Sequence, residues 1–235
     1  MNVESQLAVE SSDGGTFNCF LVTPTAKTRA PAILLVQEIF GINDNMRWTA
    51  HRYAKAGFLV LVPDLFWRLS PGIDLDPADP QQRTKAMELN SQFDAQLGLA
   101  DCGQAIRAIR THSASSGRVG AVGYCLGGRL TFLLAARDSV DASVCFYPVA
   151  VQPDLKTLQI SGIPLLVHLA NDDALCGADT QLEIKSSVES GKANRVETYP
   201  GVGHGFARMG RQGNAADAAE LAESITIDFL NEHLA

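Results

Sequence analysis

Short apolar runs, each followed by a longer segment with helical periodicity, make up most of this 235-residue chain. The apolar runs do not alternate with polar positions and contain many branched side chains, which is typical of strands buried on both faces of a parallel sheet. The predicted buried strands are residues 32–36, 58–62, 118–122, 143–146 and 164–169, with a weaker final strand at 194–198.

The segments between these runs carry apolar residues at helical spacing. The predicted helices are residues 45–56, 80–93, 97–110, 128–136, 180–190 and 215–233. In the last of them, Leu221, Ile225 and Phe229 recur every fourth residue, which predicts one apolar stripe behind an Asn214 cap.

The chain begins differently, with two strand-like segments at residues 6–9 and 16–22 that flank the turn signal Ser12-Asp13-Gly14-Gly15. This arrangement predicts an N-terminal antiparallel hairpin. The alternation of strands and helices that follows predicts an α/β protein with a mostly parallel central sheet and helices on both faces. No polar linker interrupts it, so we expect a single domain over residues 1–235. The long connection at residues 70–80 is expected to border a functional site.

Composition narrows the classes of partner and location. A net charge of −7 without a basic cluster argues against nucleic acid or an anionic membrane as a partner. The N-terminus lacks the features of a signal peptide, and no apolar segment approaches membrane length. Five cysteines without framework spacing or a Cys-x-x-Cys pair fit a reducing cytoplasm, and the histidines show no metal-ligand spacing. We therefore expect a cytoplasmic protein without a metal site.

The segment Gly123-Tyr124-Cys125-Leu126-Gly127 lies between a predicted strand and a predicted helix, and it has the pattern of a nucleophile elbow with a thiol in place of the usual hydroxyl. Glycines flank the elbow because its central residue is strained. Cys125 would lie at a helix N-terminus, which favours a thiolate. The elbow makes the α/β-hydrolase fold the predicted class. The other cysteines are expected to be small buried apolar residues: Cys19, Cys102, Cys145 and Cys176.

An α/β-hydrolase supplies its acid and then its histidine after the nucleophile in chain order. Asp172 and Asp173 both follow the strand at 164–169, so the residues alone leave the acid undecided, and either one could instead cap the next turn. His204 lies in a glycine-rich loop after the final strand, where it could accept the proton of the Cys125 thiol. The other histidines are expected to be structural: His51, His112 and His233 solvated, and His168 in the core.

An oxyanion hole is predicted from two backbone N–H groups, those of Leu126 after the nucleophile and Ile39 in the loop after the strand at 32–36. The neighbouring Glu38 is unexpected, because a carboxylate beside a thiol raises the pKa of that thiol. The alternative is that Glu38 is a surface residue at the end of a strand.

The chain resembles the dienelactone hydrolases, also called carboxymethylenebutenolidases, over nearly its whole length. The resemblance rests on residues 37–41 (QEIFG), 63–66 (PDLF), 123–128 (GYCLGG) and 203–208 (GHGFAR). It implies a cofactor-free enzyme that serves in aromatic hydrocarbon catabolism, with a triad of Cys125, His204 and Asp173. The family's intervals between these residues favour Asp173 over Asp172. The resemblance also implies that Glu38 holds the resting thiol and takes its proton when an anionic substrate arrives.

The resemblance further implies that Arg83 and Arg208 bind the substrate carboxylate, a role that suits the planar fork of a guanidinium group. Three positions depart from well-known members of the family. Met87 replaces a tyrosine, Asn90 a tryptophan and Gly205 a serine. These departures leave the triad intact and the particular substrate open.

The leading hypothesis is a hydrolase that opens 4-carboxymethylenebut-2-en-4-olide to maleylacetate through a thioester on Cys125. The expected partner is this small anionic lactone, and the expected assembly is a monomer or weak homo-oligomer. A second hypothesis keeps the triad but assigns another lactone, ester or thioester. A third is a non-catalytic, redox-responsive protein in which Cys125 is an oxidisable thiol.

Overall fold

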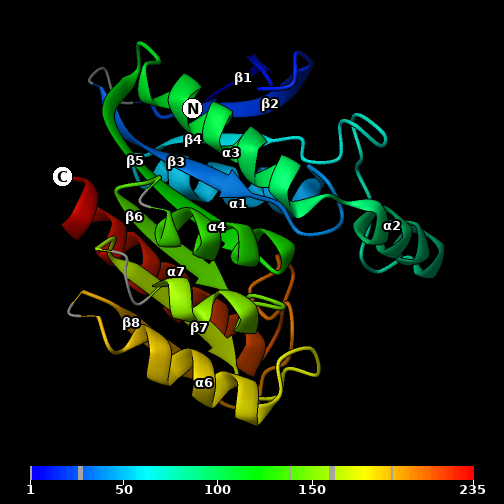
Figure 1. Ribbon diagram of the computed structural model, residues 1–235, viewed down its shortest axis with the longest axis vertical. Helices are drawn as coiled ribbons and strands as arrows, with labels where there is room; N and C mark the ends of the chain where they lie inside the picture. The colour runs from blue at the N-terminus through cyan, green and yellow to red at the C-terminus, as the bar shows by residue number, and fades with distance from the viewer. Residues whose placement is uncertain (1, 26–28, 138, 159–161, 192) are drawn as a thin grey trace. The chain divides into compact units, whose positions relative to one another are not determined.

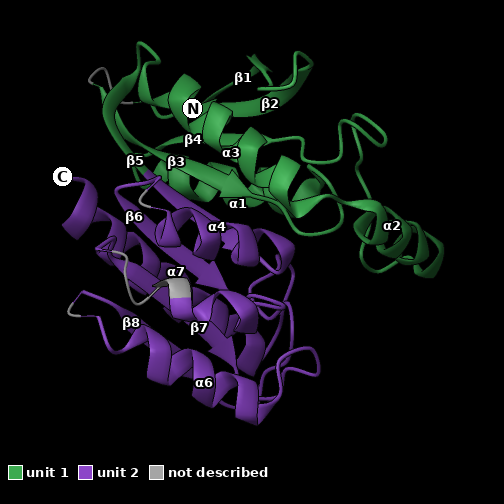
Figure 2. Cartoon of the chain, in the orientation of Figure 1, with its two compact units in different colours: residues 1–119 green, residues 120–235 purple. Residues whose placement is uncertain are grey.

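The computed structural model describes residues 2–25, 29–137, 139–158, 162–191 and 193–235. Contacts within the chain divide it into two compact units, called here unit 1 (Met1–Val119) and unit 2 (Gly120–Ala235), which Figure 2 shows in green and purple. The prediction of one domain over residues 1–235 stays a prediction. No helix of the described residues is both long and apolar enough to cross a membrane.

Unit 1 begins with the predicted hairpin. Its strands lie in the order β1-β2-β4-β3, and its elements are β1 (Val3–Glu10), β2 (Thr16–Thr23), β3 (Ala30–Val36), α1 (Asp44–Lys55), β4 (Leu59–Pro63), α2 (Pro80–Gln92) and α3 (Ala95–Arg110). β2 pairs antiparallel with β1 and β4, whereas β3 and β4 are parallel. In Figure 1, α3 lies in front of these strands, α1 behind them and α2 apart from them.

Unit 2 contains strands that run in one direction. β5 (Ser115–Tyr124) begins in unit 1 and ends in unit 2, where it is followed by α4 (Leu126–Ala136), β6 (Ala142–Phe146), the 3₁₀ helix η1 (Gln152–Asp154), α5 (Leu155–Leu158), β7 (Leu165–Ala170), α6 (Ala178–Val188), β8 (Arg195–Tyr199) and α7 (Asn214–Leu234). The strands lie in the order β5-β6-β7-β8, and each neighbouring pair is parallel. In Figure 1, α4 and α6 lie in front of these strands and α7 behind them. The carboxyl ends of the four strands therefore share one edge.

The burial of the strands explains their apolar runs. Every residue of β4, β6 and β7 is buried, so neither face of these strands alternates with solvent. β1 is mostly exposed and carries polar residues, as suits a strand at the end of the strand order. The mostly parallel arrangement and the N-terminal antiparallel hairpin agree with the predicted fold class.

The predicted cap and stripe of α7 were wrong in part. The helix begins at Asn214 itself, with Gly213 as its N-cap, and the Asn214 side chain donates instead to the carbonyl of Pro200 at 3.0 Å. Leu221 is 55% exposed. The buried stripe is Ala218, Ala222, Thr226, Phe229, Leu230 and Leu234. Small residues in that stripe let α7 lie close to the strands. The spacing of the large apolar residues alone does not predict which face of the helix is buried.

Candidate active site

Cys125 occupies the single position between the end of β5 and the start of α4. Its backbone has φ 55° and ψ −111°, a strained conformation for a residue with a side chain. Two of the flanking glycines are required by close backbone packing. A Cβ atom at Gly123 would lie 2.1 Å from the carbonyl oxygen of Gly127, and one at Gly128 would lie 2.7 Å from that of Phe146. These contacts produce the sharp strand–turn–helix geometry of an elbow.

The elbow sets Cys125 at the N-terminus of α4. Cys125 is the N-cap residue, its carbonyl accepts from the N–H of Arg129 at 3.1 Å, and its residue is 7% exposed. The first-turn N–H groups of a helix, here including that of Leu126, have no intrahelical acceptor. They favour negative charge on a thiolate or on an oxyanion formed at the thiol.

The acid and the histidine meet at the same edge of unit 2. Asp173 follows β7, His204 follows β8, and Nδ1 of His204 lies 2.8 Å from Oδ2 of Asp173. The side chain of Asp173 is 1% exposed. Its other oxygen accepts from the N–H of Leu175 at 2.8 Å, whereas Asp172 is exposed. The structure therefore pairs Asp173, not Asp172, with the imidazole.

His204 has one nitrogen committed and one open. A carboxylate only accepts hydrogen bonds, so the pair with Asp173 assigns the proton of the neutral ring to Nδ1. Nε2 of His204 is buried and has no hydrogen-bond partner among the described residues. A buried imidazole nitrogen with a free lone pair can take the proton of a nucleophile.

Tyr147 links the elbow to the histidine. The N–H of Cys125 donates to the carbonyl of Phe146 at 3.1 Å. The ring of the next residue, Tyr147, packs against that of His204, with the ring centroids 4.9 Å apart and the planes at 64°. Tyr147 is fully buried and has φ 36°. It was not predicted from the sequence, and the available signal was an aromatic residue directly after a strand at the catalytic edge.

Glu38 and Ile39 belong to unit 1, in the loop after β3. Glu38 is 2% exposed, so its interpretation as a surface residue was wrong. The fully buried Gln37 fixes this loop, because its side chain donates to the carbonyl of Glu38 at 3.2 Å and accepts from the N–H of Leu65 at 3.3 Å. Ile39 is half-buried.

The long connection folds back onto the same loop. The N–H of Ile42 donates to the carbonyl of Ile73 at 3.0 Å, and the N–H of Leu75 donates to the carbonyl of Phe40 at 2.9 Å. These backbone bonds place the connection beside the residues that follow Ile39. The connection thus lies beside the loop after β3 within unit 1, and the expectation that it borders a functional site stays a prediction.

Arg83 lies on α2, a helix with only Ala86 and Leu89 buried. Arg83 is exposed, and its guanidinium donates to the carbonyl of Pro77 at 2.7 and 3.2 Å. Met87, on the same helix, is 62% exposed.

Arg208, the other predicted arginine, belongs to unit 2. It is half-buried and lies four residues after His204 in the sequence. Among the predicted site residues, Asp173 and His204 contact each other directly. Arg83 instead contacts Pro77, in the connection that leads into its own helix.

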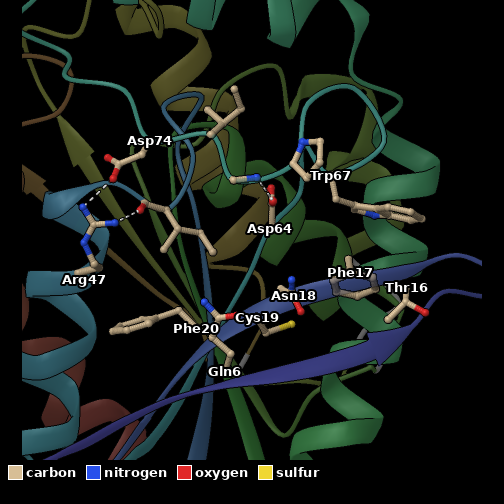
Figure 3. A pocket seen from close by; sticks show the side chains of 14 residues that line it. Gln6, Thr16, Phe17, Asn18, Cys19, Phe20, Arg47, Asp64, Trp67 and Asp74 are labelled. Atoms are coloured by element: carbon tan, nitrogen blue, oxygen red, sulfur yellow. Dashed lines mark hydrogen bonds and ion pairs between the residues drawn. The ribbon is translucent and has the colours of Figure 1, made fainter.

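A cavity of about 470 Å³ is lined by residues of unit 1 (Figure 3). Its polar lining groups pair with one another: Arg47 lies 2.8 Å from Asp74, and Asp64 accepts from the N–H of Gly72 at 2.7 Å. Burial raises the pKa of Asp64. The fourteen residues that line the cavity do not include Glu38 or Arg83. These groups hold the connection after β4 in place.

The predictions that His168 lies in the core and that the four cysteines other than Cys125 are buried agree with the structure, whereas His51, His112 and His233, predicted to be solvated, are half-buried. His168 is fully buried, with Nδ1 2.8 Å from the Tyr199 hydroxyl and Nε2 2.9 Å from the Thr226 hydroxyl, and burial lowers its pKa to about 3. Burial raises the pKa of Cys145 to about 12 and that of Cys176 to about 11. Within the described residues, no group of three or more His, Cys, Asp or Glu side chains could hold a metal ion.

A strained nucleophile elbow, followed in chain order by an aspartate and a histidine at the carboxyl ends of parallel strands, defines the α/β-hydrolase class. The sequence model of the dienelactone hydrolase family matches residues 17–234, and the chain belongs to that family. It is therefore an enzyme that acts on ester or lactone bonds.

Individual relatives agree with this assignment. The chain is 39% identical to a carboxymethylenebutenolidase of Pseudomonas putida over 224 residues, which are 95% of this chain and 94% of that protein. It is 34% identical to carboxymethylenebutenolidase 1 of Cupriavidus pinatubonensis over 94% of both chains. The crystal structure of a candidate dienelactone hydrolase from Klebsiella pneumoniae shares the fold, with a TM-score of 0.85, 23% identity and coverage of 98% of this chain and 99% of that one.

Proposed function

We propose that the enzyme opens carboxylate-bearing unsaturated enol lactones, converting 4-carboxymethylenebut-2-en-4-olide to maleylacetate, with Cys125 as the nucleophile. The observation that carries the proposal is the His204–Asp173 pair, whose open Nε2 lies in the unit that also holds the strained Cys125. The names of the relatives from Pseudomonas putida and Cupriavidus pinatubonensis support the choice of lactone.

In the first step, the Cys125 thiolate attacks the lactone carbonyl carbon. The negative charge that develops on the carbonyl oxygen is stabilised by the N–H of Leu126 at the start of α4 and by the N–H of Ile39. The ring C–O bond then breaks, and the electron pair leaves on the enol oxygen. Because an enolate is a good leaving group, acylation proceeds without strong general-acid assistance.

In the second step, water hydrolyses the thioester. Nε2 of His204 takes a proton from the water, which attacks the thioester carbonyl, and the sulfur of Cys125 leaves and recovers a proton from the imidazolium. Asp173 holds the Nδ1–H of His204 and stabilises the imidazolium. The enolate takes up the proton that Glu38 received from the Cys125 thiol, and the resulting enol tautomerises to the keto group of maleylacetate.

Glu38 completes the proposal as a gate on the thiol. A buried carboxylate beside Cys125 would keep the resting thiol protonated, since it raises the pKa of that thiol. An anionic substrate would rearrange the pair, so that Glu38 takes the proton and the thiolate forms. A nucleophile that stays protonated until substrate arrives is protected from oxidation and stray alkylation.

Arg83 and Arg208 are proposed to bind the substrate carboxylate. Both can present two N–H groups in one plane, which matches the two oxygens of a carboxylate. Arg83 is exposed on α2 and would leave the Pro77 carbonyl to meet the substrate, whereas Arg208 is half-buried beside the His204 loop.

The testing experiment compares turnover of the cis- and trans-dienelactones with turnover of a simple p-nitrophenyl ester, using Cys125→Ser as the control. We expect a clear preference for a dienelactone, and we expect the serine variant to lose that activity. Equal or reversed preference would overturn the lactonase assignment while leaving the family membership intact.

A second candidate function is hydrolysis of a different lactone or ester at the same triad. Met87 and Asn90 on α2 and Gly205 beside His204 favour it, because they replace larger or polar side chains of the family. The chain is also 28% identical to a probable 2-oxo-3-(5-oxofuran-2-ylidene)propanoate lactonase of Bradyrhizobium. If Arg83→Ala and Arg208→Ala both left turnover of the true substrate unchanged, a carboxylate substrate would be excluded. Membership of a hydrolase family speaks against the non-catalytic, redox-responsive alternative.

The proposal includes a cytoplasmic location, which the five free thiols support, because such thiols persist in a reducing compartment. It also includes action without a cofactor, as a monomer or weak homo-oligomer. Size-exclusion chromatography with light scattering over a range of protein concentrations tests the predicted assembly.

A further inference from the structure

The carbonyl of Gly205, the residue directly after His204, collects three donors. The N–H of Arg208 lies 3.2 Å from it, and the guanidinium of Arg211 donates to it twice, from Nε at 3.1 Å and from Nη2 at 2.9 Å. Gly205 is buried, although Arg211 is largely exposed. Arg211 therefore fixes the turn that joins His204 to Arg208.

Because Gly205 has no side chain, the guanidinium of Arg208 can pack directly against its backbone. A Cβ atom at Gly205 would lie 2.7 Å from Cζ of Arg208 and 2.9 and 3.0 Å from its Nη1 and Nε. The guanidinium of Arg208 therefore lies against the Cα of Gly205. Any larger residue at this position would push the guanidinium away, and the φ of 72° there would also strain that residue.

We propose that Arg211 is a positioning residue that sets the place of the Arg208 charge through the Gly205 carbonyl, and that Gly205 makes this arrangement possible. Arg211 thereby favours substrates with a carboxylate near His204. The inference rests on the proposed role of Arg208 in carboxylate binding. It explains why the exposed Arg211 donates two hydrogen bonds to the carbonyl oxygen of Gly205, next to the proposed general base His204.

The chemistry of the contact distinguishes this role from a general charge effect. Arg211 uses two N–H groups held in one plane, which lysine cannot reproduce although it keeps the positive charge. If Arg211 acted only through its charge, Arg211→Lys would behave like the native enzyme. If it served only to stabilise the loop, its loss would weaken neutral and anionic ligands equally.

The experiment measures binding of two unreactive lactam analogues by calorimetry, one carrying the carboxylate and one carrying a neutral amide in its place. The variants are Arg211→Lys and Arg211→Gln. The matched control is Arg195→Gln on β8, which removes an equal charge from an exposed arginine that pairs with Glu197 at 2.7 Å.

We expect Arg211→Lys and Arg211→Gln each to weaken binding of the carboxylate about tenfold, because charge-assisted contacts to Arg208 become misaligned. Binding of the amide should change by less than about twofold, and Arg195→Gln should match the native protein. In steady-state assays the same variants should raise KM for the anionic lactone more than they lower kcat.

Three results would overturn the inference: native carboxylate binding in Arg211→Lys, equal loss of carboxylate and amide binding, or no native preference for the carboxylate over the amide. Failure of the proposed function looks different. An enzyme that leaves dienelactones intact but binds the carboxylate in an Arg211-dependent way would retain this inference and lose the lactonase assignment.

Discussion

Nδ1 of His204 lies 2.8 Å from Oδ2 of Asp173, and the carboxylate is almost fully buried. The Asp173→Asn variant keeps the size of the side chain but presents an amide that can donate to Nδ1. The imidazole would then hold its proton on Nε2, where a general base must be free. We expect kcat to fall by about a hundredfold to ten-thousandfold with little change in the melting temperature.

The neighbouring exposed aspartate supplies the control for this prediction. Asp172→Asn changes the same functional group one residue away, and its side chain is exposed. It should retain nearly native kcat on the same substrate. Comparable loss in both variants would contradict the assignment of Asp173 as the acid.

Close backbone packing at the elbow gives a steric prediction. A Cβ atom at Gly123 would lie 2.1 Å from the carbonyl oxygen of Gly127, which is backbone and cannot swing aside. Gly123→Ala should therefore lower the free energy of unfolding by about 3 kcal/mol or more, as measured by denaturant titration. Gly162→Ala is the control, because a Cβ atom there meets nothing within 4 Å. Equal stability of the two variants would show that the elbow can relax.

Much of the fold and part of the site were predictable from local sequence. The strands before and after the elbow were predictable because burial on both faces leaves continuous apolar runs. Cys125 was predictable because the glycines around it are required by local backbone packing. The choice between Asp172 and Asp173 was not, because both follow the same strand. It is set by which carboxylate faces His204, a contact between residues distant in sequence.

Arg211 had no signal in the sequence for a related reason. Its partner is the carbonyl of Gly205, a group that every residue carries, so neither residue type nor spacing marks the contact. Likewise, the buried stripe of α7 contains Ala222 and Thr226 in place of larger apolar residues, since the helix packs close to its neighbours. Contacts made through backbone or small side chains leave little hydrophobic pattern.

A buried ionic network in unit 1 predicts a large loss of stability. Asp101 is fully buried and accepts from the Ser11 hydroxyl and the Trp67 indole, both at 2.9 Å, and it pairs with Arg68. Asp101→Ala would leave the Ser11 hydroxyl and the Trp67 indole without this acceptor and would remove the buried partner of Arg68. We expect the free energy of unfolding to fall by about 3–5 kcal/mol. Asp13→Ala removes the exposed partner of Arg68 and should leave the unfolding midpoint nearly unchanged; a similar loss there would contradict the role of burial.

The pKa of His168 predicts how stability depends on pH. Burial lowers it from 6.5 to about 3 in the folded protein, so the unfolded chain binds a proton in this range that the folded protein does not. The contribution of a neutral His168 to the free energy of unfolding is fully present above pH 6.5. It is lost as the pH falls toward 3, by up to about 1.4 kcal/mol per pH unit. Urea titrations between pH 4 and 7 would measure this slope. It should be reduced in His168→Gln and retained in His51→Gln, whose side chain is partly exposed; an unchanged slope in His168→Gln would assign the effect to other groups.

The proposed gate predicts an unusual response of Cys125 to alkylation. Cys19, Cys102, Cys145 and Cys176 are buried, and burial raises the pKa of each thiol, so mass spectrometry can follow iodoacetamide at Cys125 without interference from them. The native enzyme should react slowly at pH 7. Glu38→Gln removes the carboxylate that opposes thiolate formation, so Cys125 should react about tenfold faster while lactone turnover falls. Glu197→Gln, which removes a half-buried carboxylate on β8 that pairs with Arg195, should match the native rate. A native thiol that already reacts as fast as that of Glu38→Gln would show that Glu38 does not hold the proton of Cys125.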